Sequence, residues 1–305
     1  MRIPESVLII LSFGAIYFIW GSTYLLNYFA IQDIPPFLMA GTRFFVAGCL
    51  LYGLALSSGK AQRISLKQLG NVAMMGILFL SIGTGGTVWA EQYVDTGMAA
   101  LITTFQPLLT TLLMWLILSN KPNWKAILGV FLGMVGMSLL IGQPRLVSDD
   151  AVLFGIGIIG VSVVSWSFAS VVITRLDLPV YRAQGTALQM VLGGLVLILS
   201  SLISGESAGF ATTDVGMKAG LSWIYLVIFG SMVTFSAFNY LLQKVSPDIV
   251  ATSTYVNPVV AMLLGWAFNN EVITSQSTLA AIIMLTGVFF IHSGRLANRK
   301  PLKSM

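Results

Sequence analysis

Long apolar stretches, separated by short polar connections, follow one another along the whole chain. A helix that crosses the hydrocarbon core of a bilayer needs about 20 predominantly apolar residues. Ten stretches approach or exceed that length, and we expect each to form a transmembrane helix: residues 7–29, 36–57, 69–91, 97–119, 124–142, 151–173, 183–204, 219–240, 248–269 and 276–294. The pattern therefore predicts an all-α membrane protein whose helices are joined by short connections.

The composition supports this prediction. Apolar residues make up 56% of the 305 residues and charged residues 9%, whereas soluble domains average about 25% charged residues. Because so few charges could not cover the surface of a soluble protein of this length, the bilayer must solvate most of it. The first apolar stretch is too long for a signal peptide and lacks a small-x-small cleavage site, so we expect it to remain as a helix.

The third and fourth stretches recur later in the chain as the eighth and ninth. Before the connecting turn the offset is 147 positions, and it joins Gly83, Thr87, Ala90 and Tyr93 to Gly230, Thr234, Ala237 and Tyr240. After the turn the offset is 151 positions, and it joins Thr103, Pro107 and Trp115 to Thr254, Pro258 and Trp266. Because each half holds five stretches, an odd number, the second half should enter the membrane from the opposite side. We therefore expect two inverted-topology repeats of five helices, residues 1–146 and 147–305.

The basic residues are distributed unevenly between the two sides that this topology defines. Thirteen of the 16 Lys and Arg residues fall on the side of the N terminus, whereas Arg145 and Lys218 fall on the other side and Arg43 lies inside a helix. Cytoplasmic loops of membrane proteins carry an excess of Lys and Arg. We therefore expect both termini in the cytoplasm, and we interpret the net charge of +5 as a signal of topology and not of nucleic-acid binding.

Polar residues lie at depths where a bilayer normally excludes them. Gln106 and Asn257 occupy matching places in the repeat, and each directly precedes a proline, Pro107 or Pro258. A proline inside a helix leaves a carbonyl unpaired, which is tolerated where a neighbouring helix or a wet cavity satisfies it. We expect the two polar faces to meet at a central cavity near the membrane midplane. The alternative is that Gln106 and Asn257 only bond neighbouring helices and that nearby Thr residues bond their own helix.

Arg43 and Glu91 are ionisable residues at the depth of the predicted helices. An intramembrane Arg costs about 2.5 kcal/mol or more and normally has a partner. Glu91 is the nearest carboxylate in both depth and sequence, so we expect a charge pair. The second repeat has Ala187 and Phe238 at these places, so the charges belong to one half only. A structural clamp and a gating or coupling role are both open at this point.

Four segments resemble the EamA-type transporters of the drug/metabolite transporter superfamily. They are WGSTY at Trp20–Tyr24, Pro35-Pro36 followed by Arg43-Phe44, WAEQYVDTGMAAL with a later QP at Trp89–Pro107, and Asn257-Pro258 followed by Glu271. The resemblance covers nearly the whole chain in order and spacing. The chain departs from the family pattern after the fourth helix, where Asn120-Lys121 stands in place of a glutamate.

The resemblance implies export of small metabolites, amino acids or drug-like compounds across a bacterial inner membrane. It implies a cavity formed by the first, third, fourth, sixth, eighth and ninth helices. Carried over by position, the lining would come from Trp20, Tyr24, Trp89, Gln106, Trp166, Asn239, Tyr255 and Asn257. For Trp20 and Trp89 a place in the interfacial aromatic belt is an equal alternative.

No phosphate-binding loop, metal-ligand cluster or nucleophile–base pair is recognisable in the sequence, so we expect no catalytic residue, metal or cofactor. Transport of a small-molecule substrate across the surrounding membrane lipids would then be secondary: exchange with a counter-substrate, facilitated transport, or transport coupled to a proton. A membrane-embedded enzyme would need carboxylates, His or Cys grouped at one depth. A carrier of nucleotide-sugar-like or phosphorylated substrates would need several buried Lys or Arg, and only Arg43 is available. A binding or scaffold protein is a third alternative.

Overall fold

The computed structural model describes residues 4–141, 149–208, 210, 215–269 and 273–296. Within these ranges the chain forms helices and no strand, which confirms the all-helical prediction. Eight helical spans in the described part are long and apolar enough to cross a membrane by length and composition: Glu5–Ile31, Pro36–Ser57, Leu66–Ala90, Thr96–Leu118, Asp150–Arg175, Arg182–Ser204, Met217–Leu242 and Pro247–Asn269. The other two expected segments form α8 (Trp124–Ile141) and α15 (Ser275–Leu296), whose apolar runs are shorter.

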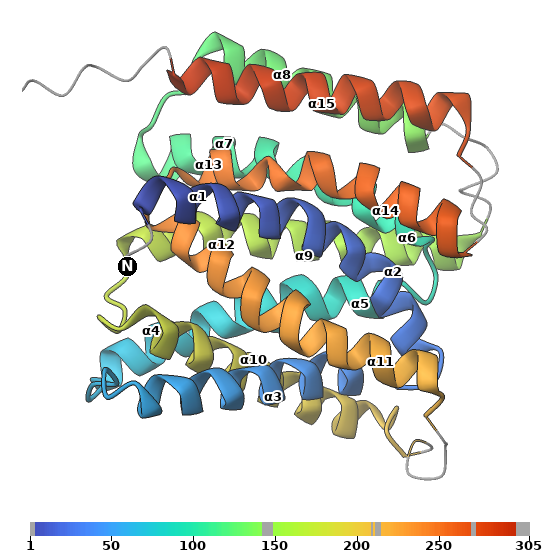
Figure 1. Ribbon diagram of the computed structural model, residues 1–305. Helices are drawn as coiled ribbons and strands as arrows, with labels where there is room; N and C mark the ends of the chain where they lie inside the picture. Colours follow the sequence, from blue (N-terminus) through green and yellow to red (C-terminus); the bar gives the residue numbers. More distant parts are fainter. Residues whose placement is uncertain (1–3, 142–148, 209, 211–214, 270–272, 297–305) are drawn as a thin grey trace, which may run out of the picture.

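The spans divide into the helices labelled in Figure 1 as follows. The first span holds α1 (Glu5–Gly14) and α2 (Trp20–Ile31), the second is α3 (Pro36–Ser57), the third holds α4 (Leu66–Gly76) and α5 (Gly86–Ala90), and the fourth holds α6 (Thr96–Ile102) and α7 (Gln106–Leu118). When α8 is counted as the fifth segment and α15 as the tenth, the sixth span begins with α9 (Asp150–Val172), and the seventh is α10 (Arg182–Ser204). The eighth holds α11 (Met217–Tyr225) and α12 (Thr234–Leu242), and the ninth holds α13 (Pro247–Ala251) and α14 (Ser253–Asn269).

Residues with suitable backbone preferences set several helix ends. Pro36 occupies the first turn of α3, where its missing N–H costs no hydrogen bond. Ser65 and Gln68 form a reciprocal capping box at the start of α4. Gly205 ends α10 in the left-handed region, with φ of 75°. The boundary expected between residues 146 and 147 lies outside the described residues.

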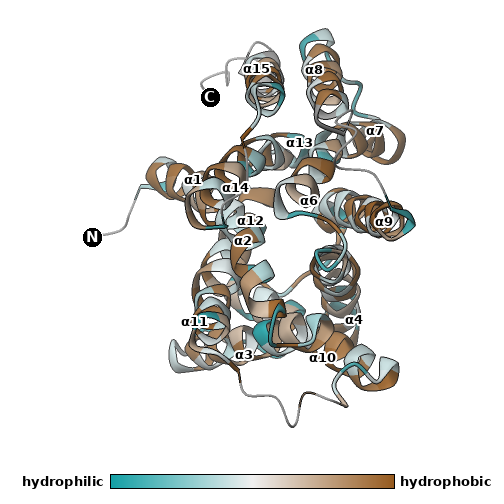
Figure 2. Cartoon of the chain, turned by 90° about the vertical axis from the view of Figure 1, so that its right-hand side faces the viewer, coloured by the Kyte–Doolittle hydropathy of each residue, from teal (hydrophilic) through white to brown (hydrophobic). Residues whose placement is uncertain are grey.

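Two helix pairs flank the bundle. α8 packs along α15 at one end of its cross-section, and α3 packs along α10 at the other end (Figures 1 and 2). Gly129 of α8 and Gly287 of α15 bring two backbones together, because a Cβ on either would lie 2.5 or 2.6 Å from the carbonyl oxygen of the other. Small residues at such crossings let membrane helices approach closely. The pairs frame the six spans that lie between them.

Three of the spans contain a π-helical segment near their middle: Ala15–Ile19, Ile77–Gly85 and Leu226–Val233. The fourth span tightens to a 3₁₀ turn at Thr103–Phe105, directly before Gln106. Side chains of neighbouring helices satisfy backbone carbonyls in these irregular segments. Ser165 donates to Leu78 O at 2.8 Å, and Trp20 Nε1 donates to Gly230 O at 3.3 Å. At these two carbonyls the irregular backbone is therefore satisfied by protein, as membrane depth requires.

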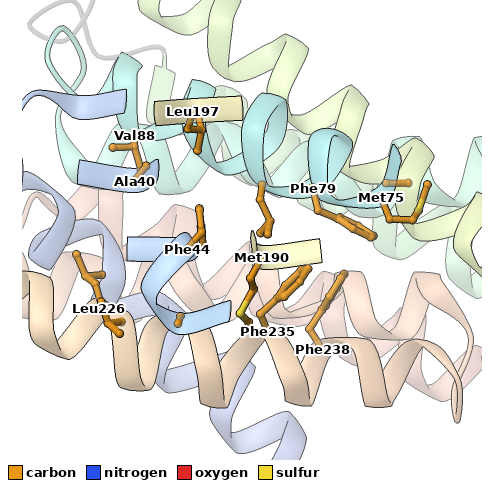
Figure 3. Close-up of a cluster of buried hydrophobic side chains, with 14 of the residues drawn as sticks. Ala40, Phe44, Met75, Phe79, Val88, Met190, Leu197, Leu226, Phe235 and Phe238 are labelled. Carbon is orange, nitrogen blue, oxygen red and sulfur yellow. The ribbon is translucent and has the colours of Figure 1, made fainter. Parts of the chain in front are cut away.

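A large apolar core fills the space between these segments (Figure 3). Phe79 of the third span faces Phe235 and Phe238 of α12, and all three side chains are fully buried. Met75 and Met190 extend the same cluster toward α4 and α10. This core holds the third, seventh and eighth spans together beside the candidate site.

Candidate functional site

A cavity of about 100 Å³ lies among the spans in the middle of the bundle. Its wall is formed by side chains or backbone of the first, second, third, fourth, sixth, eighth and ninth spans, so it includes every span that the family resemblance implied and adds α3. Small-molecule sites typically measure about 300–1,000 Å³. The cavity in this conformation therefore admits only a few atoms, and a metabolite could enter only if the wall moved apart.

Five of the eight residues expected to line a cavity do meet in this wall: Trp20, Tyr24, Gln106, Trp166 and Asn257. Tyr24 Oη lies 3.1 Å from Thr103 Oγ1, which joins α2 to the fourth span. Gln106 is buried at the start of α7, and its backbone carbonyl oxygen accepts a hydrogen bond from the Ser167 hydroxyl at 3.4 Å. The polar and aromatic groups of four spans therefore converge on one space.

Asn257 binds a neighbouring helix as well as facing the cavity. In the amide orientation that satisfies its surroundings, Nδ2 donates to Tyr17 O at 2.9 Å and to Ile16 O at 3.0 Å. Both carbonyls belong to the π-helical segment Ala15–Ile19. The side chain therefore fastens α14 to the irregular part of the first span, and its Oδ1 is the atom left for a ligand.

Arg43 forms one end of the cavity wall, and its side chain is 2% exposed. Nε donates to Ser231 Oγ at 2.8 Å, and Nη1 donates to Asn27 Oδ1 at 2.9 Å. The guanidinium carbon also lies 4.8 Å from the centre of the Phe44 ring. Gly230 leaves the room for this arrangement, because a Cβ there would lie 3.0 Å from Nη2. The buried cation is thus bound by neutral groups of the first and eighth spans.

Glu91 follows α5 directly and is 3% exposed. The Asn27 side chain lies near enough to interact with its carboxyl group, although by strict geometry neither carboxyl oxygen is hydrogen-bonded among the described residues. Arg43 and Tyr24 also interact with the carboxyl group electrostatically, yet the hydrogen bonds of Arg43 go to Asn27 and Ser231. Asn27 therefore touches the cation and lies within reach of the carboxyl group, and the expected charge pair has a neutral side chain between its members.

Aromatic rings form one side of the cavity wall, where Trp20, Trp166 and Phe235 line the cavity and Phe79 and Phe238 pack against them. We call Trp20, Phe79, Trp166, Phe235 and Phe238 the aromatic cluster. Trp166 contacts Trp20 at 5.6 Å, Phe79 at 4.9 Å and Phe238 at 5.3 Å between ring centroids. Such edge and tilted contacts add about 0.5–1.5 kcal/mol per pair beyond area burial. The cluster is therefore a tightly packed barrier made by the first, third, sixth and eighth spans.

The other three residues expected in the lining lie outside the cavity wall. Trp89 packs against Phe37 and Phe154 at the outside of the third span. Asn239 donates to Phe235 O on its own helix at 3.1 Å. Tyr255 covers Gly133 of α8, where a Cβ would lie 2.5 Å from the Tyr255 hydroxyl.

Sequence reasoning overlooked several residues of the wall. Asn27 was detectable, because Trp20, Thr23 and Asn27 lie at i, i+3 and i+7 and share one helix face. Ser162 gave no such signal, because it is one of several serines on the same predicted helix and nothing in the sequence singles it out. Glu271, which belongs to the family pattern described above, lies outside the described residues. Within the described ranges, no group of three or more His, Cys, Asp or Glu side chains could hold a metal ion.

The fold and the cavity define a polytopic helical membrane protein with a central polar and aromatic site. The sequence model of the EamA-like transporter family matches residues 7–142 and 153–293. The chain belongs to this family.

Relatives of similar length support the assignment. The uncharacterised inner membrane transporter YedA of Escherichia coli is 34% identical over 306 residues, which cover 99% of this chain and 96% of the relative. The uncharacterised transporter YoaV of Bacillus subtilis is 24% identical, with 93% of this chain and 96% of the relative covered. One solved crystal structure, 18% identical, superposes with a TM-score of 0.74 over 97% of this chain and 100% of that chain, which shows a shared fold.

Proposed function

We propose that the protein is a secondary transporter that exports a small amino-acid-like or drug-like metabolite across a bacterial inner membrane by alternating access. The observation that carries the proposal is the small central cavity, whose wall combines Arg43, Gln106 and Asn257 with aromatic rings. A cavity of about 100 Å³ must expand before a metabolite can enter. The name of the relative YedA, an inner membrane transporter, supports the location.

The chemistry of the wall favours a substrate with a polar or anionic head and an apolar body. Arg43 has neutral hydrogen-bond partners, so much of its positive charge is available to a carboxylate. Gln106 can both donate and accept hydrogen bonds. Trp20, Trp166 and Phe235 would pack against an apolar body, as in most small-molecule sites.

A carrier or exchanger of nucleotide-sugar-like or phosphorylated substrates is the alternative. Phosphate groups carry more charge than a carboxylate and are usually bound by several Arg or Lys side chains. Arg43 is the single Arg or Lys among the described residues of the cavity wall. The charge of the wall therefore favours the amino-acid-like or drug-like class.

The proposal is tested with purified protein and a panel of amino acids, drug-like amines and acids, and nucleotide sugars. A ligand that binds only the folded state at 100 times its Kd stabilises it by about 2.7 kcal/mol, which raises the melting temperature. Stabilising compounds are then loaded into proteoliposomes, and their flux is compared with that from protein-free vesicles. We expect flux of a stabilising amino-acid-like or drug-like compound. Stabilisation without flux would indicate a binding protein, and flux of nucleotide sugars alone would favour the alternative.

The proposed transporter has ten spans in two inverted repeats, with residues 1–146 in the first, 147–305 in the second and both termini in the cytoplasm. The excess of Lys and Arg on the N-terminal side supports this topology. A fluorescent protein fused after Met305 should fluoresce, and alkaline phosphatase fused there should be inactive, because that enzyme needs the periplasm. Strong phosphatase activity would contradict the topology.

A further inference from the structure

A second hollow lies on the outside of the bundle between α3, the third span, α9 and α10. We call it the side groove and define it by Phe37, Ile77, Ile82, Phe154, Gly157 and Leu197 in its wall. Its volume is about 650 Å³, much larger than that of the central cavity. Phe154 is 59% exposed and Ile82 is 39% exposed, so the groove opens away from the protein.

The groove lies at the depth of one leaflet's hydrocarbon. Along α9 its wall extends from Leu153 to Ser162, which is about 4.5 to 18 Å from the helix start at 1.5 Å per residue. Half of a bilayer's hydrocarbon core is about 15 Å thick. Because α9 belongs to a span long and apolar enough to cross a membrane, we infer that the groove faces acyl chains.

The chemistry of the groove suits hydrocarbon alone. No charged residue belongs to its wall among the described residues. Its three hydroxyls are already used: Ser81 donates to Gly193 O at 2.9 Å, Ser162 to Ile82 O at 3.0 Å and Ser200 to Val196 O at 2.9 Å. A water molecule or a lipid headgroup would therefore find few partners, whereas an apolar chain would restore the dispersion contacts that an empty groove lacks.

The groove and the central cavity share one thin wall. Ser162 lines both, and a Cβ on Gly86 would lie only 2.4 Å from its hydroxyl oxygen. The π-helical segment Ile77–Gly85 likewise contributes to both spaces. An occupant of the groove would therefore press on the two elements that bound the cavity on this side.

We propose that the side groove binds one hydrocarbon chain of a membrane phospholipid and holds it longer than the boundary lipid around it. The bound hydrocarbon chain supports the π-helical segment Ile77–Gly85 and α9 from outside while the central cavity changes shape on the inside.

Gly157 permits a direct test. A Cβ there meets no atom within 4 Å, so Gly157→Leu fills the groove without a clash. Gly160→Leu is the matched control, because it adds the same side chain to the same helix, also meets nothing within 4 Å, and lies outside the groove wall. Equal melting temperatures of the two variants and the parent in detergent will show that both fold.

The three proteins are reconstituted in phosphatidylethanolamine and phosphatidylglycerol vesicles that contain a phospholipid with a diazirine on its acyl chain. After illumination, mass spectrometry locates the labelled peptides. We expect labelling of Leu153–Ser162 in the parent and in Gly160→Leu, and loss of most of it in Gly157→Leu, with unchanged labelling at the exposed Phe131 of α8. Equal labelling in all three would mean ordinary boundary lipid, and protein–protein cross-links at the groove would mean a second copy; either result overturns the proposal. The readout needs no substrate, so it is independent of the transport proposal.

Discussion

Replacing Arg43 with Ala is expected to abolish transport and to lower the free energy of unfolding by about 3 kcal/mol, near the lower limit for breaking a buried charge pair. The substitution removes the donor for Asn27 and Ser231 and deprives the buried Glu91 carboxyl of its nearby cation. Thermal unfolding in nanodiscs measures the loss. Arg182→Ala is the control, because that side chain is exposed and stacks on Tyr240 near the end of the bundle.

Glu91→Gln shows whether the two charges act as a pair. Since Gln keeps the shape and removes the charge, the double variant should lose less stability than the sum of the single variants. We further propose that Glu91 carries the coupling proton, because its carboxyl group is buried beside the neutral Asn27 side chain and, among the titratable groups of the described residues, interacts with Arg43 and Tyr24. Glu91→Gln should then retain substrate exchange but lose transport driven by a pH gradient. Additive losses in the cycle would exclude the pair, and gradient-driven flux in Glu91→Gln would exclude the proton site.

The sequence was sufficient for the eight long spans of the described residues and for the convergence of Gln106 and Asn257, because the first follow from the apolar pattern and the second from the sequence repeat. It could not give the rotation of each helix about its axis. Thr254 and Tyr255 are neighbours about 100° apart on α14, and the structure turns Thr254 to the cavity and Tyr255 to Gly133 of α8. Irregular segments before Trp20 and before Gln106 change the helix phase further, and no sequence pattern announced their length.

The need for a partner at Arg43 was also predictable from the cost of burying its charge, but the choice of partner was not. A carboxylate at similar depth was the simplest solution from sequence. The structure uses Asn27 and Ser231, two neutral acceptors on other spans, and places Asn27 between the guanidinium and the Glu91 carboxyl group. Neutral acceptors satisfy the guanidinium hydrogens without cancelling the charge. A purely structural clamp would gain from direct pairing, so this arrangement favours a functional use of both charges.

The two ends of the cavity differ in chemistry at neighbouring positions that the sequence repeat makes equivalent. The offset of 147 relates Glu91 to Phe238. Phe238 belongs to the aromatic cluster and is 1% exposed, whereas Glu91 lies beside Asn27 and Arg43. In an alternating-access cycle the aromatic end would open by separating rings, independently of pH. The other end would respond to any ligand or proton that changes the charge between α2, α3 and α5.

Gln106→Leu is expected to lower substrate affinity at least about tenfold, the equivalent of 1.4 kcal/mol lost with one buried hydrogen bond, while the melting temperature stays unchanged. Its side chain lines the cavity, and Leu has a similar length without the polar atoms. Thr110→Val is the control, one turn further along the same face of α7: Thr110 is fully buried, its hydroxyl has no partner among the described residues, and it does not line the cavity. Asn257→Leu should differ from both, because it also breaks the bonds to Ile16 O and Tyr17 O and should cost about 1–3 kcal/mol of stability. Melting temperatures measured over a ligand titration give both the substrate affinity and the stability of each variant. If Gln106→Leu keeps the affinity of the parent protein, or Thr110→Val loses it, the substrate is held elsewhere and the polar face of the fourth span serves only to pack helices.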